Sequence, residues 1–408
     1  DGLQHRVEVA VERAAAIGYP PQHARALTQL ARLAYNGQQY ATAQRVARSA
    51  YEISASSDHA RIAAGSAWLV AAAALGSREL ETAAEFSEIA IGLSRHVDAV
   101  LLARAESLRA AVYRTSGDFE GARALGESAV ARLERSQAAG SLRMAESYTA
   151  LAATLGEMGE LDEATHYATA AREIFASVEG ERSRGALNVR NELAILRGLS
   201  GDHEGATELH KEVLEARIDA LGAQDPDVAQ SWINLAGSQY AAGQHEQAAS
   251  TGLVGAELQA ELRGADHPLT AAAYFNVAAV LLQLDRFVEA EVLLRRSHEA
   301  IIARLGADHP DTILSGCGLS FALLALGRDE AAAQVTGRAA AVAERHLDAQ
   351  AAGTALYDRA RLRLVAGDYV GVLDDARRIR EILAAQRPED ASLRSQAQRW
   401  FEMNGIVI

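Results

Sequence analysis

Histidine, cysteine and carboxylate side chains are the residues of this sequence that could carry metal, nucleophilic or acid–base chemistry. The 408 residues include 12 histidines and one cysteine, Cys317. A zinc site needs ligands at short fixed spacing, as in a His-Glu-x-x-His helix or a Cys-His cluster, and neither pattern occurs. Cys317 has no motif partner that would activate its thiol, and paired acids such as Asp374 and Asp375 read as solvated helix residues. We therefore expect no metal, no cofactor and no catalytic centre in this chain.

The elements that carry these residues recur with a nearly fixed period. A step of the form Gly-x-aromatic-x-x-Ala appears first at Gly117, Phe119 and Ala122. We use its middle position, which is most often aromatic or Leu, as the marker of each repeat. The nine markers, 39 to 42 residues apart, are Tyr40, Leu80, Phe119, Leu161, His203, His245, Phe287, Asp329 and Tyr369. This self-similarity predicts nine repeats of one supersecondary unit.

Two columns of small residues accompany the markers. Three residues after each marker stands Ala in every repeat except the last, where Val372 takes the place. Nine residues before each marker stands Ala or, in the eighth repeat, Ser320. Small side chains at fixed places allow two antiparallel helices to approach closely. Each repeat is therefore predicted to be a helix hairpin.

Glycine and proline mark the ends of the predicted helices. Most repeats carry a glycine two residues before the marker, where a first helix must end in an open or left-handed turn. Gln38 and Arg78 replace this glycine in the first two repeats. Further glycines 42 residues apart, Gly180 to Gly306, and the prolines that follow them predict the turn between one repeat and the next.

These columns resemble the tetratricopeptide repeat family. Segments such as Leu-Gly-Ala-Asp-His-Pro-Asp-Thr at 305–312 are more specifically similar to kinesin light chain repeats. The resemblance implies an all-α fold, a right-handed superhelical α-solenoid of about nine hairpins over residues 22–386. Residues 1–21 are expected to form a capping helix or the remnant of a preceding repeat. Residues 387–408 are expected to form a capping helix and an apolar tail.

The resemblance also implies a concave groove lined by the first helix of each hairpin, and it nominates residues for contact with a partner. The nominated residues are Arg32, Trp68, Arg104, Arg114, Asn188, Asn191, Asn234, Tyr240, Phe275, Asn276 and Phe321. From the first to the last they change from basic to apolar, which suits an extended peptide with an acidic end and a hydrophobic end. Two alternatives stay open: Phe275 and Phe321 could pack between helices, and Asn234 and Asn276 could form structural hydrogen bonds.

Composition limits the partners and the compartment. Acidic residues exceed basic residues by 14, which argues against nucleic acid or an anionic membrane as the main partner. No run of apolar residues is long enough for a transmembrane helix, and a lone cysteine favours a reducing, cytoplasmic compartment. The first eleven residues show neither an initiator Met nor a signal pattern, so we expect the chain to come from a longer protein.

Two interpretations of function follow. The first is a scaffold that binds a protein or peptide, as the sensory or recruiting part of a larger bacterial signalling protein. In composition the chain resembles the C-terminal regions of myxobacterial serine/threonine kinases. The second is a self-assembling or autoinhibited scaffold, in which the apolar tail from Trp400 to Ile408 docks into a groove of its own chain or of a second copy.

Overall fold

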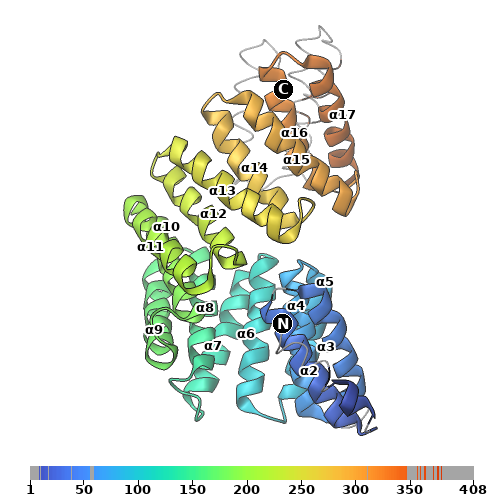
Figure 1. Ribbon diagram of the computed structural model, residues 1–408, viewed down its shortest axis with the longest axis vertical. Helices are drawn as coiled ribbons and strands as arrows, with labels where there is room; N and C mark the ends of the chain where they lie inside the picture. Colours follow the sequence, from blue (N-terminus) through green and yellow to red (C-terminus); the bar gives the residue numbers. More distant parts are fainter. Residues whose placement is uncertain are drawn as a thin grey trace. The chain divides into compact units, whose positions relative to one another are not determined.

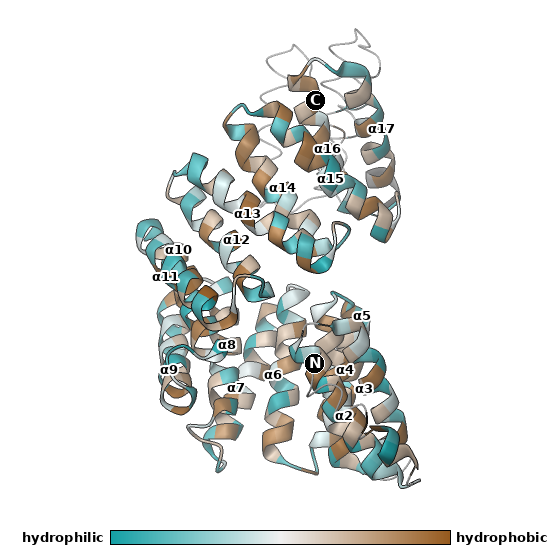
Figure 2. Ribbon diagram, viewed as in Figure 1, coloured by the Kyte–Doolittle hydropathy of each residue, from teal (hydrophilic) through white to brown (hydrophobic). Residues whose placement is uncertain are grey.

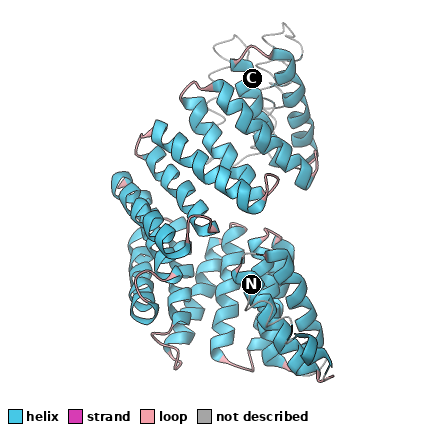
Figure 3. Ribbon diagram, in the orientation of Figure 1, coloured by secondary structure: helices cyan, strands magenta, loops and turns pink. Residues whose placement is uncertain are grey.

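The computed structural model describes residues 18–346 apart from 38, 56–58 and 310, with residue 9, residues 11–16 and six positions at 356, 359, 363, 371, 375 and 378. Described residues form helices and short turns, with no strand among them (Figure 3). The predicted cap and tail after Pro388 and the turn of the ninth repeat lie outside the described residues. The chain divides into two compact units, residues Asp1–Asp202 and His203–Ile408.

The first unit stacks helix hairpins (Figure 1). Within it α2 packs against α3, α4 against α5, α6 against α7 and α8 against α9. The first helices of successive hairpins also pack on one another, from α2 on α4 to α8 on α10. The bounds are α2 Pro20–Asn36, α3 Tyr40–Ala55, α4 Ala60–Gly76, α5 Leu80–Ser94, α6 Ala99–Thr115, α7 Phe119–Glu134, α8 Leu142–Glu157, α9 Leu161–Glu179 and α10 Arg184–Leu199.

The second unit has the same organisation. Here α12 packs against α13, α14 against α15 and α16 against α17, while α14 also packs on α16. The bounds are α11 His203–Leu221, α12 Pro226–Ala241, α13 His245–Arg263, α14 Pro268–Gln283, α15 Phe287–Leu305, α16 Asp311–Ala325 and α17 Asp329–His346. Most helices carry both hydrophobic and hydrophilic residues (Figure 2), as helices with one buried face require.

The repeat frame predicted from the sequence is confirmed at the helix starts. Every marker from Tyr40 to Asp329 is the first residue of a helix. The alanines three residues later, from Ala43 to Ala332, are at most 1% exposed. The column nine residues before the marker is buried from Ala31 to Ser320, except at Ala236, which is half-buried. Small residues do lie where the paired helices are closest.

The turn before each second helix keeps a left-handed residue even where glycine is missing. Gly117, Gly159 and Gly243 have φ angles of 82°, 82° and 76°. Arg78 and Asp285 occupy the same place with φ angles of 62° and 57°, a conformation that residues with a Cβ adopt rarely. The packing of the hairpin therefore fixes the turn, and glycine only makes it easier to form.

None of the helices in the described part of the chain combines the length and the apolar composition needed to cross a bilayer.

Candidate functional site

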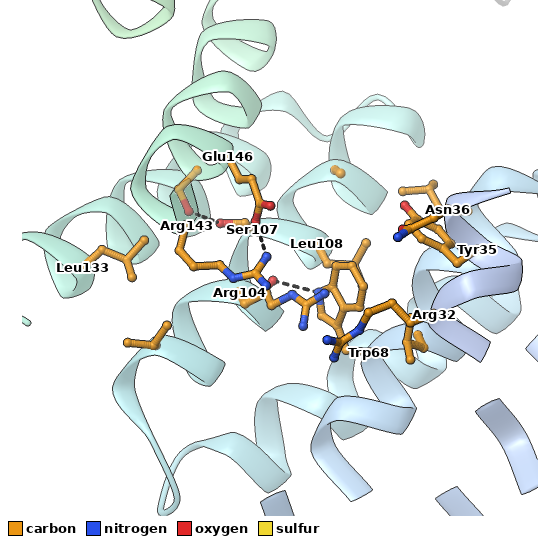
Figure 4. A pocket seen from close by; sticks show the side chains of 15 residues that line it. Arg32, Tyr35, Asn36, Trp68, Arg104, Ser107, Leu108, Leu133, Arg143 and Glu146 are labelled. Carbon is orange, nitrogen blue, oxygen red and sulfur yellow. Dashed lines mark hydrogen bonds and ion pairs between the residues drawn. The ribbon is translucent and has the colours of Figure 1, made fainter. Parts of the chain in front are cut away.

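A basic pocket of about 510 Å³ opens on the first helices of the first unit. Its polar lining includes Arg32 from α2, Arg104 from α6, and Arg143 and Glu146 from α8, with Trp68 from α4 beside them. Figure 4 shows the guanidinium groups of the three arginines pointing toward one another next to the indole ring. Of the residues nominated from the sequence, Arg32, Trp68 and Arg104 meet here.

The pocket crosses the first helices obliquely. Arg32, Trp68, Arg104 and Arg143 lie 8, 12, 15 and 18 residues before the first residue of the next helix. Each is thus about one helical turn earlier than its neighbour in the preceding hairpin. Successive hairpins of a solenoid are rotated relative to one another, and residues that meet need not share a column. Arg143, in the first turn of α8, was missed for this reason.

The guanidinium of Arg104 is held in place by Trp68. Its Cζ lies 3.5 Å from the centroid of the indole ring, a close cation–π contact. The indole Nε1 donates a hydrogen bond of 3.2 Å to the backbone carbonyl oxygen of Arg104. The ring of Tyr35 packs edge-on against the same indole, with centroids 6.0 Å apart. These contacts join α2, α4 and α6 and fix the plane of one arginine in the pocket.

The charges in the pocket do not cancel. The pKa of Arg104 is lowered to about 10, chiefly by burial and also by the charges of Arg143 and Arg32, while Glu146 opposes the change. Arg104 therefore stays protonated at neutral pH. Glu146 is already occupied, because Arg143 donates to its carboxylate at 2.6 Å. Among the described residues, no ion pair joins Arg32 or Arg104 to a carboxylate, and the Nε atoms of both are buried without a hydrogen-bond acceptor.

Arg114, also nominated from the sequence, has a different environment. It forms an ion pair with Glu157 of α8. Glu192 of α10 is part of the same group, since the charge of Arg114 acts on it. Burial raises the pKa of the Glu192 carboxyl, with Arg114 lowering it and Glu157 raising it. The positive charge of Arg114 is thus compensated within the chain, and that of Arg104 is not.

A second, apolar cavity of about 280 Å³ lies in the second unit between α12, α13 and α14. Small residues such as Gly237 and Gly252 form much of its wall. Two nominated residues, Tyr240 and Asn276, lie at this cavity. The hydroxyl of Tyr240 accepts a hydrogen bond from Gln283 Nε2, and its ring packs against His245 with centroids 5.1 Å apart.

The other nominated residues lie outside both pockets. On α10, Asn188 is exposed and Asn191 half-buried. Asn234 accepts a 2.9 Å hydrogen bond from Gln230 in its own helix. Phe275 is half-buried and packs against the core of the second unit, whereas Phe321 on α16 is 41% exposed. Their role in binding a partner remains a prediction.

The histidines of the turns act in the structure as backbone acceptors. The Nδ1 atoms of His267 and His309 accept hydrogen bonds from the backbone N–H groups of Leu269 and Asp311, both at 3.2 Å. Cys317 is buried. Over the described residues, no three His, Cys, Asp or Glu side chains gather closely enough to hold a metal ion.

Stacked helix hairpins, with a left-handed residue in the described turns from Arg78 to Gly327, define this protein as an α-helical repeat protein. The sequence pattern of the tetratricopeptide repeat family matches residues 101–177, 143–219, 185–252 and 270–345, which together make up more than half of the chain. The chain belongs to the tetratricopeptide repeat family. No curated protein matches it.

Solved structures with a similar fold include a Rap protein and a quorum sensor. The first is a Rap protein in complex with Competence and Sporulation Factor: 16% identity, a TM-score of 0.57, and coverage of 90% of this chain and 100% of that one. The second is the apo form of the quorum sensor NprR from B. thuringiensis: 14% identity, a TM-score of 0.55, and coverage of 86% and 97%. A putative kinesin light chain from Podosopora anserina, with nearly identical TPR-like repeats, is 24% identical, with a TM-score of 0.44 and coverage of 49% and 95%. At these identities the similarity concerns the fold.

Proposed function

We propose that the chain is a scaffold that binds a protein or peptide partner on the first helices of the first unit, with an acidic segment of the partner in the basic pocket. One observation carries the proposal: Arg32 and Arg104 line a pocket of about 510 Å³, and in the described structure neither has a carboxylate partner. Grouping like charges without a counter-ion is unfavourable, and a bound carboxylate relieves that cost.

Two further points support a binding role. The stack on Trp68 fixes the plane of the Arg104 guanidinium before any partner arrives, so little side-chain entropy is lost on binding. The Rap protein, which shares the fold, was solved with Competence and Sporulation Factor bound. We place the chain, on this basis, as the recruiting or sensory part of a larger bacterial signalling protein.

An array of short random-sequence peptides, probed with the labelled protein at low and high salt, tests this function. We expect the signal to rise with the number of acidic residues and to fall as salt screens the pocket. Arg104→Gln should weaken binding to acidic peptides about 10- to 100-fold, the range for a lost charge-assisted hydrogen bond.

Arg95→Gln is the matched control for this experiment. It removes an equal charge from an exposed residue at the end of α5 in the same unit, and it should leave binding close to that of the parent protein. Equal signals from acidic and neutral peptides, or an Arg104→Gln protein that binds like the parent, would refute the proposal.

A further inference from the structure

The charge balance of the basic pocket indicates how much negative charge its ligand carries. Three guanidinium groups from Arg32, Arg104 and Arg143 meet one carboxylate, that of Glu146. The carboxylate is held by Arg143 at 2.6 Å. Two positive charges are left, on Arg32 and Arg104, so a ligand with two negative charges neutralises the pocket and a single carboxylate does not.

The geometry of the two arginines suits a group with several oxygens. The face of the Arg104 guanidinium lies against the Trp68 ring, which leaves its N–H edge in the plane for donation. The Nε atoms of Arg104 and Arg32 are both buried and have no acceptor. A guanidinium edge donates two parallel hydrogen bonds to one oxyanion, and a group with three oxygens can offer different oxygens to two such edges.

We propose that the pocket binds a phosphorylated side chain of the partner. A phosphomonoester carries about −1.5 to −2 charges at pH 7 and three strong acceptor oxygens, and so it can accept from Arg32 and Arg104 together. Leu75, Val100 and Ala111 also line the pocket and are partly exposed, so they offer an apolar surface to the carbon part of the ligand. This inference rests on the proposed function and specifies the ligand at the same pocket.

A matched set of peptides tests the charge requirement. Acidic sequences selected from the array are synthesised in three forms, with serine, glutamate or phosphoserine at one position, and their affinities are measured by fluorescence anisotropy. We expect the phosphoserine form to bind about 10-fold or more tighter than the glutamate form, since two charge-assisted contacts replace one.

The outcomes separate this inference from the function on which it rests. Glutamate forms that bind as tightly as phosphoserine forms would overturn the phosphoryl site and leave the acidic-peptide scaffold intact. If no form binds the parent protein better than it binds Arg104→Gln, both proposals fail.

The pH profile gives a second readout. The groups that face Arg104 are Arg32 and Tyr35 from α2 and Arg143 and Glu146 from α8, and the lining of the pocket contains no histidine. Burial raises the pKa of the Tyr35 phenol and the pKa of Arg104 is about 10, so neither group changes charge between pH 7.5 and 5.5. A phosphomonoester gains a proton with a pKa of about 6, whereas a glutamate stays ionised down to about pH 4.3.

We therefore expect the affinity for phosphoserine peptides to fall several-fold from pH 7.5 to 5.5, while that for glutamate peptides stays constant. Parallel profiles would contradict the proposal. Arg32→Gln, at a half-buried residue that should tolerate substitution, should reduce the preference for phosphoserine over glutamate. Arg95→Gln should keep it, and circular dichroism of both variants confirms that the helices are intact.

Discussion

At the scale of single residues, the arginines differ in their hydrogen-bond partners. Some donate to acceptors on a neighbouring helix, whereas Arg104 has no such bond among the described residues. Arg109 donates to the carbonyl oxygen of Ala84 at 2.6 Å and stacks on Tyr113. Arg217 donates to Ser231 at 2.6 Å. These arginines cross-link neighbouring helices. Arg104 is equally fixed in position by Trp68, but it lines the pocket and its Nε has no acceptor in the described structure.

His210 in α11 is a buried titratable residue whose protonation opposes folding. It is 4% exposed, and its Nδ1 has no hydrogen-bond partner. Burial lowers its pKa to about 4, with a smaller contribution from the charge of Arg217. Because the unfolded chain binds this proton at about pH 6.5, the stability contributed by neutral His210 is complete above that pH. It is lost as the pH falls toward 4.

From pH 7 to pH 5 we expect His210 alone to lower the free energy of unfolding by about 2 kcal/mol. His210→Leu should remove that part of the pH dependence. Urea unfolding followed by circular dichroism at pH 7, 6 and 5 measures it. Exposed His166 gives the control variant His166→Gln, which should keep the slope of the parent. Burial lowers the pKa of His298 as well, so some slope remains; an unchanged slope in His210→Leu would disprove the assignment.

At the scale of helices, the sizes of facing side chains are matched within a hairpin. In the hairpin of α12 and α13, Gly255 lies opposite Trp232, and a Cβ on Gly255 would stand 2.9 Å from the Trp232 Cβ and 2.8 Å from Ile233 Cδ1. Five other repeats have alanine at this place: Ala50, Ala90, Ala129, Ala171 and Ala339. The missing methyl group makes room for the large residue on the facing helix.

Two glycine-to-alanine substitutions in this hairpin should have opposite effects on stability. Gly255→Ala should destabilise the protein by about 1–3 kcal/mol, since overpacking exceeds the gain in helix propensity. Gly237→Ala, on α12 with no atom within 4 Å of the new Cβ, should stabilise it by about 0.5–1 kcal/mol. Urea unfolding of both variants provides the comparison. If both substitutions stabilised the protein, Trp232 would be able to shift away from the new methyl group without a cost in free energy.

The sequence predicted the fold in detail because its framework depends on local rules. The markers predict where the second helices start. The glycines and the columns of small residues predict the turns and the close helix packing. Even Arg78, which lacks glycine's freedom, keeps the turn. The site was predicted less completely. The repeat frame predicted Arg32, Trp68 and Arg104 as lining residues. Arg143 joins them because the pocket crosses the first helices obliquely, and this depends on the rotation between successive hairpins. Within the described residues, Arg114 forms an ion pair and Arg104 does not. This difference depends on which carboxylate of a neighbouring helix lies close to each arginine.

At the scale of the whole molecule, helix contacts follow the order of the chain. Among the helices that the structure describes, every pair in extensive contact is one or two positions apart in the sequence order. The stability of such a chain is approximately a sum of repeat and interface terms, so that segments open locally.

A destabilising change in one unit should therefore have local effects. In Gly255→Ala, we expect amide hydrogen exchange to increase in α12 to α15 and to change little in α2 to α5. Hydrogen-exchange mass spectrometry of the intact chain measures both regions at once, and Gly237→Ala serves as the control. An equal increase along the whole chain would mean that it unfolds as a single cooperative body.

The same local contacts affect how the chain can fold during its synthesis. A helix emerging from the ribosome has its preceding partners already made, and it need not wait for a distant segment to complete its packing. Hairpins can add one by one to a growing stack as translation proceeds. The five helices that line the basic pocket, α2, α4, α6, α7 and α8, belong to the first half of the chain. The pocket can thus be complete while the second unit is still being translated.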